Sequence, residues 1–261
     1  MLAAQRQAQI LQEVNQRGAA KIADLAQFAG VSEMTVRRDL DYLADQGLLD
    51  KVHGGATAIV DTSSVSEPPF KAKSLREQTA KSAIAEQAST LATSGSSVAL
   101  MGGSSVYAMA PFLVDIPWLT VLTNSLPVSD YFQREGRADQ TVILTGGIRT
   151  PTDSFVGEIT ISVFDKLNVD IAFMGTHGMD LRGGFSSPNI LEAETNRAIR
   201  QHAKQTVILA DHTKWGQVGF ATFAQLNEAD VIVTDDGIST EALAALQTHI
   251  QRVIVAQPNF D

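Results

Sequence analysis

Residues suited to binding a polar ligand follow a series of short, apolar, β-branched runs in the second half of the chain. They are Gly102, Gly103, Ser104 and Ser105; Thr123, Asn124 and Ser125; Gly147 and Arg149; His177; and Asp211 and Lys214. Glycines let the backbone approach a ligand closely, and free N–H groups with nearby hydroxyls can cradle a phosphate. The mixture of hydroxyls, amides and a few charges suits a phosphorylated polyol.

A second set of residues, near the start of the chain, suits nucleic acid. Arg37 and Arg38 are adjacent within a stretch whose apolar residues have helical spacing. With that apolar face buried, Met34 and Arg38 point away from the core, and Thr35 and Arg37 lie on the two flanks. Arginines and a hydroxyl in the first turns of a helix can reach base edges and phosphates in the major groove.

Three helices must hold these arginines in place. Their apolar residues recur every three or four positions and are Ile10, Leu11 and Val14; Ile22, Leu25, Ala26 and Ala29; and Val36, Leu40 and Leu43. Gly18, Gly30 and Gly47 end the helices, and Ser32 is placed to cap the third one. The second and third helices are separated by a turn at residues 30–31, which predicts a helix-turn-helix.

A hairpin over residues 48–59 follows the third helix. The pair Gly54 and Gly55 suits a two-residue turn, which places Lys51 and His53 near the tip. We expect this hairpin to form a wing that lies along the DNA backbone or in the minor groove.

The remainder of the chain predicts a second domain of α/β class. Residues 61–70 contain a double proline and no apolar period, so we expect domains at 1–60 and 71–261 joined by a linker. Apolar runs alternate with helical segments and cover residues 97–101, 119–123, 141–144, 170–174, 206–210, 231–234 and 252–256. This alternation predicts a largely parallel sheet covered on both faces, with ligands at the carboxyl ends of its strands.

Composition restricts the classes of function. The net charge is −9, but residues 1–60 hold six basic and seven acidic side chains, so their net charge is only −1. A chain of this charge cannot coat DNA nonspecifically, and any DNA site must lie in the first sixty residues. The sequence has no cysteine, which excludes disulfides and Cys-ligated metals. It shows no signal peptide and no long apolar run, so we expect a cytoplasmic protein without membrane, metal or cofactor.

The first sixty residues resemble the winged helix-turn-helix of the DeoR family of bacterial transcriptional regulators. The matching residues are Val31 to Leu40, Leu43, Gly47 to Leu49 and His53 to Ala56. Two departures are mild: Lys51 replaces a common arginine, and Met34 replaces a frequent small polar residue. The resemblance implies that Ser32, Met34, Thr35, Arg37, Arg38, Lys51 and His53 contact double-stranded operator DNA.

The second domain resembles the sensor domain of the same family, which is similar to the phosphosugar isomerase and CoA-transferase fold. The matching residues are Gly103 to Ser105, Thr123 to Ser125, Gly146 and Gly147, Ser154 to Gly157, Pro188 and Asn189, Glu192 and Ala193, Ala210 and Asp211, Lys214, and Gly216. The resemblance implies a repressor of carbohydrate catabolism genes that leaves DNA when a phosphorylated sugar binds. Glu192 joins the expected effector residues, and a homodimer or homotetramer is expected because paired readers raise DNA affinity.

Two other functions remain open at this point. A phosphosugar isomerase or sugar-phosphate hydrolase with an extra module would need an acid–base pair, for which Asp211 with Glu192 or His177 is available. Family members commonly have an aspartate where Met101 and His177 stand and a lysine where Asn196 stands, so these replacements disfavour catalysis and favour a different effector. The third possibility is a protein-interaction module without a ligand.

Replacing Arg37 and Arg38 by alanine tests the assigned reading helix. We expect operator affinity to fall at least tenfold, because a good arginine–base contact is worth about 1–3 kcal/mol. The slope of log affinity against log salt concentration should also become shallower by about one for each phosphate that the helix no longer neutralises. Binding measured against salt concentration checks both, and unchanged affinity with an unchanged slope would show that the helix is wrongly assigned.

Overall fold

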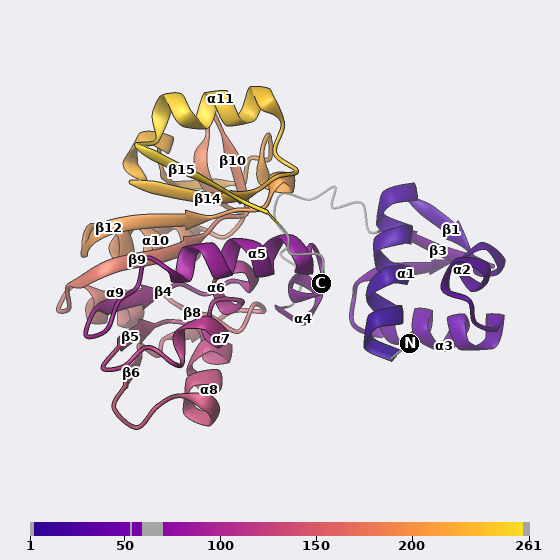
Figure 1. Cartoon of the computed structure of the whole chain (residues 1–261), viewed down its shortest axis with the longest axis horizontal. Helices are drawn as coiled ribbons and strands as arrows, with labels where there is room; N and C mark the ends of the chain where they lie inside the picture. The colour runs from indigo at the N-terminus through magenta and orange to yellow at the C-terminus, as the bar shows by residue number, and fades with distance from the viewer. Residues whose placement is uncertain (1–2, 53, 59–69, 258–261) are drawn as a thin grey trace. The chain divides into compact units, whose positions relative to one another are not determined.

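The computed structural model of the chain describes residues 3–52, 54–58 and 70–257 (Figure 1). Internal contacts divide the described residues into two units, one with residues up to 58 and 70–76 and one with residues 77–257. His53 and nearly all of the expected linker lie outside the described residues. The boundaries at 60 and 71 remain predictions.

The first unit has three long helices and a small sheet (Figure 1). Its elements are α1 (Ala3–Arg17), β1 (Ala19–Lys21), α2 (Ile22–Ala29), α3 (Glu33–Asp45), β2 (Leu49–Val52), β3 (Gly55–Ala58) and α4 (Phe70–Ser74). The apolar stripes expected from the sequence form one core, in which Val14, Leu25 and Leu40 are fully buried. The predicted three-helix arrangement is therefore confirmed.

The turn between α2 and α3 has the expected geometry. Gly30 ends α2 with a φ of 65°, a left-handed conformation that glycine adopts without steric cost. Ser32 caps the start of α3, and its side-chain oxygen accepts a hydrogen bond from the Thr35 N–H at 3.2 Å. The two helices are thus joined by a short turn with both ends capped.

The hairpin after α3 differs from the prediction by one residue. Gly55 is not in the turn: it lies in β3, opposite Val52 on one side and Lys21 on the other. The reason is that β1, which the sequence did not predict, completes a sheet in the order β1-β3-β2. A Cβ at Gly55 would lie 2.3 Å from the Ala20 carbonyl oxygen, so glycine serves here for close strand packing.

The second unit is built on a seven-stranded parallel sheet in the order β15-β14-β12-β9-β4-β5-β6. The strands are β4 (Ser97–Leu100), β5 (Thr120–Thr123), β6 (Thr141–Leu144), β9 (Val169–Gly175), β12 (Ala203–Leu209), β14 (Val231–Asp235) and β15 (Arg252–Ala256). These are the seven apolar runs of the sequence. The predicted α/β class with a parallel sheet is confirmed.

Helices cover both faces of the large sheet (Figure 1). One face packs against α5 (Gln78–Ser89), α6 (Ser104–Tyr107), α7 (Ala110–Leu113) and α8 (Leu126–Glu135). The other packs against α9 (Glu158–Phe164), α10 (Ile190–Gln201) and α11 (Thr240–His249). Successive residues of one strand, such as Phe173 and Met174, belong to the two different cores, as the alternation of side chains along a strand requires.

Shorter elements, which the sequence did not predict, extend the loops of this unit. They are the paired strands β7 (Ile148–Arg149) and β8 (Phe155–Val156), the sheet of β10 (Gly178–Asp180), β11 (Gly184–Ser187) and β13 (Ala221–Ala224), and the 3-10 turns η1 (His212–Lys214) and η2 (Leu226–Glu228). In the described part of the chain no helix has the length and apolarity needed to cross a membrane.

One carboxylate ties the three central strands together near their amino ends. Asp170 of β9 accepts hydrogen bonds from the N–H and the hydroxyl of Ser97 in β4, both at 2.8 Å. It also accepts one from Lys204 Nζ of β12 at 2.8 Å. The hydrogen bond from Lys204 and those from Ser97 hold the pKa of the Asp170 carboxyl at about 2.

This shift predicts a loss of stability in acid. A carboxyl whose folded pKa is lowered to about 2 stabilises the fold above its unfolded pKa, near 3.8, and that contribution is lost as the pH falls towards 2. Replacing Asp170 with asparagine should lower the free energy of unfolding at pH 7 by at most about 1 kcal/mol, because solvent screens the half-exposed pair. The substitution should also make the free energy of unfolding depend less on pH between pH 4 and pH 2. Denaturant unfolding at several pH values measures this, with substitution of the exposed Asp236 by asparagine as the control. If the free energy of unfolding of the Asp170→Asn variant fell as steeply between pH 4 and pH 2 as that of the wild type, the prediction would be contradicted.

Candidate functional site

The outer face of α3 is exposed as the sequence predicted. Met34 is 62% exposed, and Arg37 and Arg38 are both exposed. Arg37 lies 3.6 Å from the Glu33 carboxylate one turn earlier, a surface contact that solvent weakens. Both arginines can therefore turn towards another molecule at little cost.

Three of the other residues expected to read DNA also make internal contacts. Ser32 caps α3, and its hydroxyl lies 3.0 Å from that of Thr35. Lys51 of β2 forms an ion pair with Asp41 of α3. This pair neutralises an acid beside the reading face and joins the wing to α3. The tip residue His53 cannot be placed, because it is outside the described residues.

The order of the large sheet predicts where the second unit binds a ligand. The chain passes from β4 outward through β5 and β6, and later continues with β9 on the other side of β4. Loops after two such neighbouring strands leave in opposite directions and open a crevice at the carboxyl edge. The loop at residues 102–105 follows β4 and His177 follows β9, so both lie at this switch point.

Hydrogen bonds of the Asn124 side chain hold the loop after β4 in place. The Gly102 N–H donates to Asn124 Oδ1 at 2.8 Å, and Asn124 Nδ2 donates to the Phe155 carbonyl at 2.8 Å. A Cβ at Gly102 would lie 1.9 Å from the hydroxyl oxygen of Ser154, so only glycine fits there. Asn124 therefore joins the loops after β4 and β5 to the hairpin of β7 and β8.

Several hydroxyls expected at the effector site are used inside the fold. Thr123 Oγ1 donates to the Leu100 carbonyl at 2.6 Å and accepts from the Ser125 N–H at 3.0 Å. Ser125 in turn caps α8 through the Val128 N–H at 3.4 Å. Ser104 and Ser105 are also buried, in the first turn of α6. Because α6 has only four residues, its dipole supports a phosphate less than the sequence suggested.

The β7–β8 hairpin connects this loop cluster to α10. Thr152 of the hairpin donates to Glu192 Oε1 at 3.2 Å, and Ser187 donates to Oε2 of the same carboxylate at 2.9 Å. Gly147 lies against the hydroxyl of Thr160, and Arg149 pairs with Asp153 at 2.6 Å on the exposed side of the hairpin. After β9, the His177 N–H donates to the Ser186 carbonyl at 3.1 Å.

Asp211, at the end of β12, is a buried charge. Its Oδ1 accepts hydrogen bonds from the N–H and the hydroxyl of Thr213, whereas Oδ2 is buried without a hydrogen-bond partner among the described residues. Burial alone would raise the pKa of this carboxyl. The positive charge of Lys214, the Thr213 hydroxyl and the charge of Lys81 outweigh burial and hold the pKa below its ordinary value.

Lys81 of α5 is a candidate site residue that the sequence analysis missed. It is only 5% exposed and begins the buried stripe of α5, which continues through Ile84, Ala85 and Ala88. Because α5 precedes β4 in a parallel α/β layer, its first turn lies towards the carboxyl ends of the strands. A lysine at a buried position of a helical stripe was the available signal.

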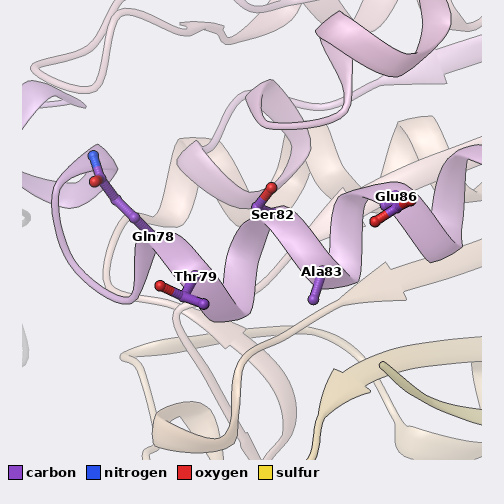
Figure 2. A pocket seen from close by; sticks show the side chains of 5 residues that line it. All are labelled: Gln78, Thr79, Ser82, Ala83 and Glu86. Atoms are coloured by element: carbon purple, nitrogen blue, oxygen red, sulfur yellow. The ribbon is translucent and has the colours of Figure 1, made fainter. Parts of the chain in front are cut away.

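A surface hollow also lies on α5 but is separate from this site. Its lining residues are Gln78, Thr79, Ser82, Ala83 and Glu86 (Figure 2). All but Ala83 are exposed, whereas Lys81 belongs to the buried face of the helix. None of the residues expected to bind the effector lines this hollow.

Within the described residues there is also no group of three or more His, Asp or Glu that could hold a metal ion.

Comparison with known proteins identifies the family. The DeoR-like helix-turn-helix domain matches residues 6–62, and the DeoR C terminal sensor domain matches residues 76–236. The chain belongs to the DeoR family. Its two units are therefore a DNA-binding reader and a sensor.

Proteins that are similar along nearly the whole chain support the same family. The uncharacterized HTH-type transcriptional regulator YgbI of Escherichia coli (strain K12) is 34% identical over 258 residues, covering 98% of this chain and 99% of YgbI. The lactose phosphotransferase system repressor of Staphylococcus aureus (strain NCTC 8325 / PS 47) is 32% identical over 246 residues, covering 94% of this chain and 96% of the repressor. This DeoR chain is a transcriptional regulator and not an enzyme, so the isomerase alternative is set aside.

A solved structure, the ribose 5-phosphate isomerase A of Methanocaldococcus jannaschii, is a more distant match. It is 16% identical, covers 53% of this chain and 54% of its own, and has a TM-score of 0.39.

Proposed function

We propose that this DeoR regulator represses genes of sugar catabolism and leaves its operator when a phosphorylated sugar binds the sensor. The name of the lactose phosphotransferase system repressor supports a role in sugar uptake or breakdown. We also propose that it acts in the cytoplasm, where a prokaryotic chromosome lies.

One observation supports a phosphorylated sugar as the effector. Two lysines interact with one buried carboxylate at the carboxyl edge of the sheet in an acidic sensor. Lys81 and Lys214 both act on Asp211. Residues 61–261 have a net charge of −8, so an anionic ligand is repelled unless cations are placed locally. Two lysines at one carboxylate, on the same edge of the sheet as the loop of glycines and serines, suit a phosphate. Asp211 Oδ2, which has no hydrogen-bond partner among the described residues, suits a sugar hydroxyl that donates to it.

The residues assigned to the effector are those of the loops at this edge, with Lys81 added. They are Lys81, Gly102, Gly103, Ser104, Ser105, Gly147, Arg149, His177, Glu192, Asp211 and Lys214. Thr123, Asn124 and Ser125 hold these loops in place, since their side chains bond to backbone groups of the neighbouring strands, loops and helix.

The residues assigned to DNA lie on α3 and the wing. Met34, Thr35 and Arg38 face base edges, Ser32 and Arg37 lie beside the phosphates, and Lys51 and His53 follow the backbone from the wing. A reader with a net charge near zero binds weakly alone, so we propose a homodimer or homotetramer on paired half-sites. The effector would favour a subunit arrangement that no longer matches the half-site spacing, which requires unequal affinity for the two arrangements.

A thermal-shift screen tests the sensor. A panel of pentose and hexose phosphates, with the free sugars and inorganic phosphate as controls, should contain at least one compound that raises the Tm. At 100 times the Kd the gain is about 2.7 kcal/mol, which corresponds to roughly 5–10 °C for a domain of this size. Lys81→Met should remove most of the shift.

The exposed Lys166→Met provides the matched control and should keep the shift. If no sugar phosphate stabilises the wild-type chain, the proposed effector class is wrong. If Lys81→Met responds as the wild type does, Lys81 is not part of the site.

A further inference from the structure

An acidic residue is buried inside the reading helix of the first unit. Asp39 of α3 is only 3% exposed, and it follows Arg38 directly in the sequence. It lies on the buried stripe with Val36, Leu40 and Leu43, where an apolar residue would be expected.

Two side chains of α1 hold this carboxylate. Arg6 Nε donates to Asp39 Oδ2 at 2.6 Å, and Arg6 Nη2 donates to Oδ1 at 3.2 Å. Gln7 Nε2 also donates to Oδ1, at 3.0 Å. Arg6 is itself mostly buried, with 14% of its side chain exposed. Three directed hydrogen bonds therefore join α1 to one point on α3, where the two helices pack together (Figure 1).

Such a contact fixes geometry more than it adds stability. Apolar side chains allow a packed helix to slide or roll slightly, because their contacts have no preferred direction. A bidentate arginine with both carboxylate oxygens engaged has one good geometry. The desolvation cost of a buried ion pair cancels much of its attraction, so an apolar replacement of similar size is often equally stable.

Rotation of α3 about its axis would move the residues that face DNA. Adjacent residues of a helix point about 100° apart, so holding Asp39 inward sets the direction of Arg38 outward. Because a long arginine side chain extends far from the helix axis, a rotation of the helix shifts its end relative to the bases, and a two-point contact with a guanine depends on that position.

We propose that Asp39, held by Arg6 and Gln7, is a positioning residue for DNA recognition, which sets the direction in which Arg38 and Met34 leave the reader. The inference rests on the proposed DNA contacts of α3. It assigns sequence selectivity, and not only fold stability, to a residue that touches no DNA.

The test uses the full chain and a random-sequence DNA library. The chain is used to select its preferred sites, and the affinity for the best wild-type site and the Tm are measured in parallel. The main variant is R6M/D39L, which replaces the pair with apolar side chains. E13Q/R17Q is the matched control, since Arg17 pairs with Glu13 within α1 alone.

We expect R6M/D39L to keep a Tm within a few degrees of the wild type, to bind the best wild-type site roughly tenfold more weakly and to select a less defined sequence. E13Q/R17Q should select the wild-type sequence. Wild-type affinity and selectivity in R6M/D39L would overturn the proposal.

If R6M/D39L proves unstable, D39N is used instead, because it keeps the shape of the side chain, removes the charge and sets an NH2 donor against the donors of Arg6 or Gln7. D39N should weaken specific binding with nonspecific affinity unchanged, and unaltered selectivity in D39N would overturn the proposal. A wild-type chain that selects no sequence would overturn the proposed DNA reading itself, and the inference with it.

Discussion

All strands of the large sheet are parallel, so their carboxyl ends lie along one edge, and the position of every candidate effector residue depends on this constraint. From β4 the sheet grows through β5 and β6 on one side, and the chain later adds β9 on the other side of β4. The loop of residues 102–105 therefore lies at a switch point of the sheet. Asn124 then joins that loop to the β7–β8 hairpin by hydrogen bonds, and Ser154 leaves room beside it only for a glycine at 102. At the opposite edge, Asp170 ties the same central strands together and takes no part in the site.

Charge is distributed differently in the two units. The reader is nearly neutral, and its exposed arginines are concentrated on α3, so specific contacts rather than a general positive field must provide DNA affinity. The sensor is acidic but places Lys81 and Lys214 beside Asp211. Each unit therefore attracts its anionic partner only where cations are placed for it.

The spacing of apolar residues and the positions of glycines predicted the main strands and the helices of the reader. β-branched runs identified the seven parallel strands, and apolar spacing with glycine ends identified the helices of the reader. The sequence could not show which polar residues bind within the fold. Thr123 and Asn124 have the chemistry of ligand contacts, yet they bond to Leu100 in β4 and to Phe155 in β8, more than 20 residues away in the sequence. Lys81 and Asp39 were missed because their partners, Asp211 and Arg6, lie far away in the sequence.

The central claim is that one chain couples a phosphorylated sugar to the release of DNA. Fluorescence anisotropy of a labelled DNA site selected by the chain, titrated with a sugar phosphate that stabilises it, measures that coupling directly. The account predicts that the sugar phosphate weakens DNA affinity by roughly 5- to 150-fold, the usual range for coupled sites, and that the unphosphorylated sugar has no effect. A sugar phosphate that binds the sensor and leaves the DNA affinity unchanged would contradict it.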